Sequence, residues 1–151
     1  MYDIRDVLRK GIIITEKKKN EYAKLLENSG DIRMRLLIGV FIREFEKDIV
    51  YYNKLVANIT DSIAEGIDFG VFDKISSLVN QFSRLIMPIN ISDRKELVAY
   101  VLEQEKATYA LLVDIQGRMV TNGNPATIAY YVLLEIIDAK RSFIEELEKM
   151  S

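Results

Sequence analysis

One segment decides the fold: residues 31–55 read DIRMRLLIGVFIREFEKDIVYYNKL. Its apolar residues recur three and four positions apart, which is the period of one face of an α-helix and not the alternation of a strand. Asp31 precedes the repeat, where an N-cap is expected. We therefore predict a helix over 32–57 whose inward stripe places one acid among apolar and aromatic residues: Met34, Leu37, Phe41, Phe45, Asp48, Tyr52 and Leu55.

The same period appears on both sides of this segment. It predicts long helices over residues 4–28, 93–120 and 125–150, and a shorter helix over 71–86. Asp3 is the expected N-cap of the first helix. Ser92 and Asp93, with Glu96 three residues after Asp93, form a capping-box signal for the helix over 93–120. Asn124 as N-cap and Pro125 at the first helical position predict the start of the last helix. The predicted fold is all-α.

The lengths of the connections predict how the helices are arranged. The first two long helices are joined by about three residues, which makes them antiparallel neighbours. The segment 58–90 is long enough to return along a 27-residue helix, roughly 40 Å at 1.5 Å per residue, so the next long helix can run parallel to the second. We expect a four-helix bundle with one long crossover, although a plain four- or five-helix bundle fits the same periodicity.

Composition limits the classes of function. The 151 residues suit a single domain, and a net charge of −2 gives no reason to expect a nucleic-acid or membrane partner. The absence of cysteine and histidine excludes disulfides, thiolate nucleophiles and the usual nitrogen and sulfur ligands of metals. Residues 1–6 do not resemble the start of a secretory signal, so we expect a cytoplasmic protein.

Two of the predicted helices contain a similar motif. Residues 14–25 read ITEKKKNEYAKL, and residues 102–112 read LEQEKATYALL. Each stretch contains a glutamate followed by a lysine; the glutamate is Glu16 in the first stretch and Glu105 in the second. The motif, its repetition and the sequence of the second helix resemble the ferritin-like superfamily, and rubrerythrin-like proteins in particular. That resemblance implies a bundle built from two duplicated helix hairpins with two metal ions in its core.

The metal-ligand pattern of that family is largely missing. Its second and fourth helices each contain a glutamate followed three residues later by a histidine. In this chain Phe45 and Asp48 occupy the first pair of positions, and Ala139 and Ser142 the second. Of the six implied ligand positions only Glu16 and Glu105 match, so the resemblance implies a degenerate member without the di-metal site.

Three functions remain open at this stage. We favour a non-catalytic bundle that acts as a scaffold, an oligomerisation unit (a homodimer) or a partner-binding protein, with no cofactor and no catalytic residue. The alternative is a divalent-metal protein or oxidoreductase with an all-carboxylate site, built from Glu16, Glu44, Asp48, Glu105, Glu135 and Asp138; oxygen ligands of this kind suit magnesium, manganese or calcium. A third possibility is a small-ligand pocket lined by Tyr22, Tyr51, Tyr52, Tyr109 and Tyr131.

The duplication also leads to an electrostatic expectation. Glu16 and Glu105 should face one another across the core, where repulsion and desolvation would raise the pKa of at least one carboxyl group. Glu105→Gln would then leave the stability at neutral pH unchanged, or raise it by about 1–2 kcal/mol.

Overall fold

The computed structural model describes residues 1–120 and 127–151. Within these ranges the chain forms helices and no strand: α1 (Ile4–Glu27), α2 (Ile32–Asn58), α3 (Phe69–Arg84), α4 (Arg94–Arg118) and α5 (Ile128–Met150). The all-α prediction is thus confirmed for this part of the chain. No described helix has both the length and the apolar character needed to cross a bilayer.

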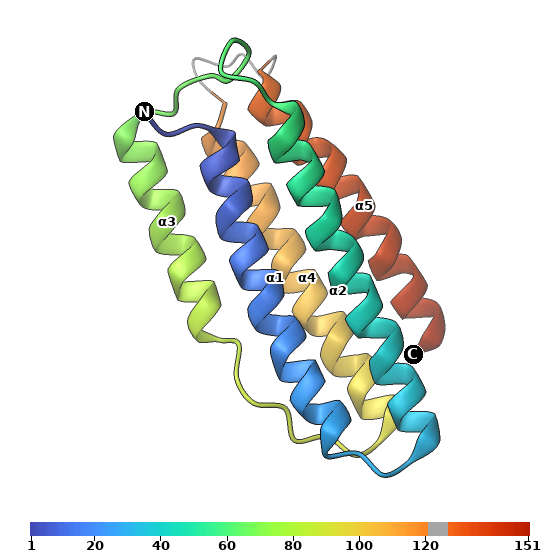
Figure 1. The fold of residues 1–151 in the computed structure, drawn as a ribbon. Helices are drawn as coiled ribbons and strands as arrows, with labels where there is room; N and C mark the ends of the chain where they lie inside the picture. Colours follow the sequence, from blue (N-terminus) through green and yellow to red (C-terminus); the bar gives the residue numbers. More distant parts are fainter. Residues whose placement is uncertain (121–126) are drawn as a thin grey trace.

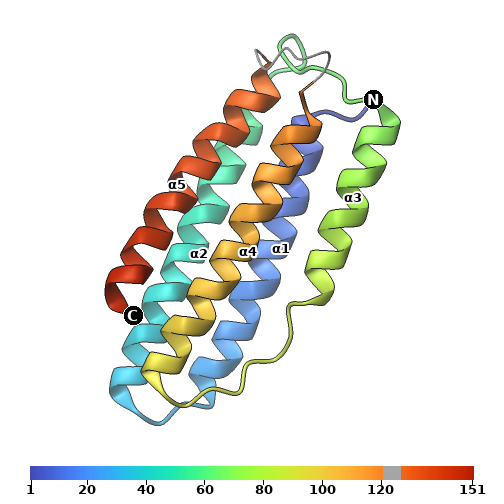
Figure 2. The same cartoon turned by 180° about the vertical axis from the view of Figure 1, so that it is seen from behind.

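The four long helices form the bundle, and α3 lies outside it (Figure 1). α1 and α2 form one antiparallel hairpin, and α4 and α5 form the other. α3 runs back along the bundle beside α1 and α4, as the view from behind shows (Figure 2). Because α3 returns the chain to the starting end of α2, α2 and α4 run in the same direction.

Short polar side chains set most helix starts where the sequence predicts them. Asp3 accepts a hydrogen bond from the Arg5 backbone N–H and forms a capping box with Asp6. Asp31 and Asp93 cap α2 and α4, as predicted.

Other predicted boundaries need correction. α3 covers 69–84 instead of 71–86, because Asp68 accepts from the backbone N–H groups of Gly70 and Val71 and so starts the helix earlier. α4 ends at Arg118 instead of 120. The predicted cap at Asn124 and the start at Pro125 lie outside the described residues; in the described part α5 begins at Ile128, capped by Thr127.

The apolar core is divided into two clusters, one toward each end of the bundle. One includes Ile4, Phe72 and Leu133 and extends under α3. The other includes Phe41 and Leu97, near the α1–α2 connection. On every long helix a charged residue lies between the two clusters in sequence, and these residues form a polar layer at the middle of the bundle.

Candidate functional site

The polar layer consists of one charged residue from each long helix: Lys18 of α1, Asp48 of α2, Glu105 of α4 and Lys140 of α5. We call these four residues the charge cluster. The side chain of Glu105 is 0% exposed, and those of Lys18 and Lys140 are 3% and 6% exposed. Asp48 is half-buried. Burial of this kind is rare for charged residues unless they are paired.

Glu105 has a cationic partner on each carboxylate oxygen. Lys18 Nζ lies 3.2 Å from Glu105 Oε1, and Lys140 Nζ lies 2.8 Å from Glu105 Oε2. Lys140 also contacts Asp48 Oδ2 at 3.3 Å, and Lys18 donates to the hydroxyl of Thr108 at 3.4 Å. Two ammonium groups and two carboxylates therefore neutralise one another, with Glu105 at the centre.

The ion pairs determine the ionisation of Glu105. Burial alone would raise its pKa, but Lys140 and Lys18 together outweigh burial and lower the pKa to about 2. The carboxylates around it raise the pKa of Lys140 above its ordinary value, in spite of its burial. Burial lowers the pKa of Lys18, and it raises that of Asp48. Glu105 is consequently an anion throughout the physiological pH range.

Aromatic side chains surround the ammonium group of Lys18. Its Nζ lies 5.2 Å from the ring centroid of Phe45, within cation–π range. Phe45 packs edge-to-face against Tyr22, with ring centroids 4.9 Å apart, and the Tyr22 hydroxyl donates to Gln104 at 3.1 Å. Phe45 thus places an aromatic ring over the ammonium group that pairs with Glu105.

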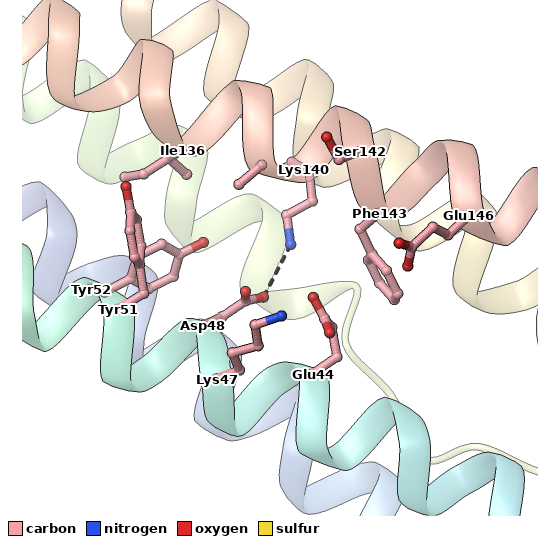
Figure 3. A pocket seen from close by; sticks show the side chains of 11 residues that line it. Glu44, Lys47, Asp48, Tyr51, Tyr52, Ile136, Lys140, Ser142, Phe143 and Glu146 are labelled. Atoms are coloured by element: carbon pink, nitrogen blue, oxygen red, sulfur yellow. Dashed lines mark hydrogen bonds and ion pairs between the residues drawn. The ribbon is translucent and has the colours of Figure 1, made fainter.

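A pocket of about 300 Å³ opens beside the cluster, between α2 and α5 (Figure 3). Asp48 and Lys140 form part of its wall, and the dashed line in Figure 3 marks their ion pair. The charge cluster therefore has one side that a small molecule can approach.

The expectation that Glu16 faces Glu105 is wrong. Glu16 is exposed on α1, and the side chain that meets Glu105 is Lys18, two residues further along. The predicted positions in the last helix are also misplaced, because Ala139 and Ser142 are exposed while Lys140 points into the core.

The remaining residues of the all-carboxylate alternative do not come together. Glu135 and Asp138 are exposed. Glu44 lies with Asp48 in the pocket wall, and Asp48 and Glu105 share one ion-pair partner, Lys140. Among residues 1–120 and 127–151 there is no group of three acidic side chains placed to hold a metal ion.

The tyrosines are only partly where the third possibility placed them. Tyr22 and Tyr52 are buried, and Tyr51 and Tyr52 line the pocket. Tyr109 is half-buried near Arg141, and Tyr131 is 57% exposed. Two of the five tyrosines thus belong to a pocket.

The apolar stripes of α1 and α5 contain a signal for the two buried lysines. Lys18 lies four residues from both Ile14 and Tyr22, and Lys140 lies four residues from Ile144; all three neighbours are buried. A lysine on an apolar stripe at helical spacing indicates a buried cation with a carboxylate partner.

We compared the chain with family models, with curated proteins and with solved structures, and found no match.

Proposed function

We propose that this protein is a non-catalytic, ferritin-like helical bundle that acts as a scaffold and binds a protein partner. The observation that supports a non-catalytic core is the pairing of Glu105 with Lys18 and Lys140. The parallel course of α2 and α4, joined through the outer helix α3, supports the ferritin-like assignment.

The pairing is unfavourable to metal binding for two physical reasons. Both oxygens of Glu105 are already occupied by ammonium groups, so a metal ion would have to displace two buried cations. Those cations would also repel any divalent ion, because charges at this depth are weakly screened. We therefore assign the charge cluster a structural role, in which lysine ammonium groups neutralise Glu105.

Metal analysis of the purified protein tests this part of the proposal. The protein would be produced with iron and manganese in the medium, desalted, and assayed both for bound metal and for oxygen-dependent oxidation of ferrous iron. We expect substoichiometric metal and no oxidation above the buffer rate. Stoichiometric metal that is lost in Glu105→Gln and kept in Glu16→Gln would contradict the proposal.

The partner surface that we propose is an exposed apolar stripe at the start of α2. Ile32, Leu36 and Val40 are 66%, 63% and 45% exposed. Beside the stripe lies a groove of about 550 Å³, and Met150 of the last turn of α5 forms part of its wall. An apolar surface of this kind is a candidate for an interface.

We propose a second copy of the chain as the occupant, because the charges around the groove complement one another. Arg33, Arg94 and Lys95 line it, while exposed glutamates lie on the final turns of α5: Glu145, Glu146 and Glu148. In a two-fold dimer each surface meets a copy of itself, so the basic side of one chain can meet the acidic helix end of the other.

Light scattering after size-exclusion chromatography tests the dimer. Leu36→Lys adds a charge within the stripe and should give a monomer, whereas Ile13→Lys, at an equally exposed position on α1, should remain dimeric. A monomeric wild-type protein would overturn the choice of a second copy, while metal analysis would still decide whether the core is catalytic.

A further inference from the structure

The pocket between α2 and α5 has the size and the chemistry of a small-ligand site. Its volume of about 300 Å³ is at the lower end of the range for such sites. In Figure 3 the side chains of Glu44, Lys47, Asp48 and Lys140 occupy the middle of the pocket, with Tyr51 and Tyr52 at one end and Phe143 and Glu146 at the other. A ligand would thus meet charge between two aromatic walls.

The charges that line the pocket leave an excess of carboxylate. Three acidic residues, Glu44, Asp48 and Glu146, line the pocket together with two lysines, Lys47 and Lys140. Lys140 is already bound to Glu105 and Asp48. Within the described ranges neither Glu44 nor Glu146 has an ion-pair partner within 4.0 Å. Burial and the neighbouring Asp48 raise the pKa of Glu44, as expected for a carboxylate without a close cation.

A second observation is independent of the carboxylates. The side chain of Tyr52 is 9% exposed and lines the pocket, yet its hydroxyl has no hydrogen-bond partner among residues 1–120 and 127–151. Here the free hydroxyl can accept a hydrogen bond from a ligand that enters the pocket.

We propose that this pocket binds a small organic cation, a primary ammonium group on a short alkyl chain. The ammonium group would donate to Glu44 and to the Tyr52 hydroxyl, and the alkyl chain would lie against the aromatic walls. Carboxylates disfavour an anion here, and a metal ion lacks a third acidic ligand in the described part of the chain.

Lys47 is a built-in competitor for the same position. It is exposed on α2, and its ammonium group lies between Glu44 and Asp48 in Figure 3 without an ion pair that fixes it there. Since Lys47 is a primary ammonium on an alkyl chain, it has the chemistry of the proposed ligand. Removing the Lys47 ammonium group should therefore strengthen binding of the ligand, whereas removing the Glu44 carboxylate should weaken it.

The test is a titration of the labelled protein with n-butylammonium chloride, followed by ¹⁵N–¹H correlation spectra. We expect saturable shifts confined to residues 44–52 of α2 and 136–146 of α5. Glu44→Gln and Tyr52→Phe should weaken binding, the former about tenfold because a hydrogen bond to a charged acceptor is lost. Lys47→Gln should strengthen it. Glu46→Gln, an exposed position on α2 outside the pocket, should not change it.

An uncharged comparison ligand and a check of folding serve as controls for the titration. n-Butanol has the same alkyl chain without the charge, and it should bind at least about tenfold more weakly. Equal binding of butanol, no saturable shift in the wild-type protein, or unchanged binding in both Glu44→Gln and Lys47→Gln would each overturn the proposal. Glu44 is half-buried without an ion pair, so we expect its variant to fold, and the spectrum without ligand verifies this.

Discussion

The substitution Glu105→Gln is expected to destabilise the protein strongly at neutral pH. Glutamine keeps the shape of the side chain but removes its charge. The ammonium groups of Lys18 and Lys140 would then remain buried with only Asp48 nearby, 3.3 Å from Lys140. An uncompensated buried charge is costly, because the protein interior solvates it poorly.

Two estimates of the loss agree. Breaking a buried ion pair by removing one partner costs about 3–5 kcal/mol. The pKa of Glu105 falls from 4.5 to about 2 in the folded state. At about 1.4 kcal/mol for each pKa unit, this difference corresponds to about 3 kcal/mol. The structure thus reverses the expectation from the sequence, in which Glu105→Gln was neutral or stabilising.

Urea denaturation followed by far-UV circular dichroism measures the effect. Glu16→Gln is the matched control: the same substitution in the other copy of the motif, at an exposed position where no loss is expected. The loss in Glu105→Gln should also shrink at mildly alkaline pH, because burial lowers the pKa of Lys18 and the unpaired ammonium can release its proton. If Glu105→Gln is as stable as the wild-type protein at neutral pH, the ion pairs do not stabilise the bundle.

Two further predictions concern the same residues. The triple variant Lys18→Met, Glu105→Leu, Lys140→Met should recover most of the stability lost in Glu105→Gln, because apolar side chains can replace a buried ion cluster without cost. If urea unfolds the triple variant more easily than Glu105→Gln, this prediction is wrong. The folded-state pKa of Glu105 lies below its unfolded value, so its contribution to the free energy of unfolding is complete above about pH 4.5 and is lost as the pH falls toward about 2. The free energy of unfolding should therefore decrease less steeply with falling pH in Glu105→Gln than in the wild-type protein.

Much of the fold was predictable because it depends on local signals. Four residues of the predicted stripe are buried: Met34, Phe41, Phe45 and Tyr52. Leu37 is only half-buried, and the fully buried Ile38 was not predicted. Asp3, Asp31 and Asp93 cap their helices through contacts within three residues. The start of α3 was missed because its cap, Asp68, lies in a segment without a clear periodic pattern.

The site was predictable only in part, because its register was taken from a family motif. One residue along a helix turns a side chain by about 100°. The motif favoured Glu16 over Lys18 and Ser142 over Lys140, and shifts of two residues direct the chosen side chains away from the core. The apolar stripe of each helix would have given the correct register. The pairing of Glu105 with both lysines depends on packing between three helices, which no local pattern contains.

The most direct test of the central claim is the ionisation of Glu105 in protein treated with a chelator. Carbon-13 spectra of labelled glutamate side chains, with the Glu105 signal assigned by its absence in Glu105→Gln, report the carboxyl group as the pH is lowered. If Lys18 and Lys140 neutralise this carboxylate, its midpoint stays at about 2 after metal has been removed. A metal ion as the true counterion would instead let chelation move the midpoint above the ordinary glutamate value of 4.5, and that result would contradict neutralisation by the two lysines.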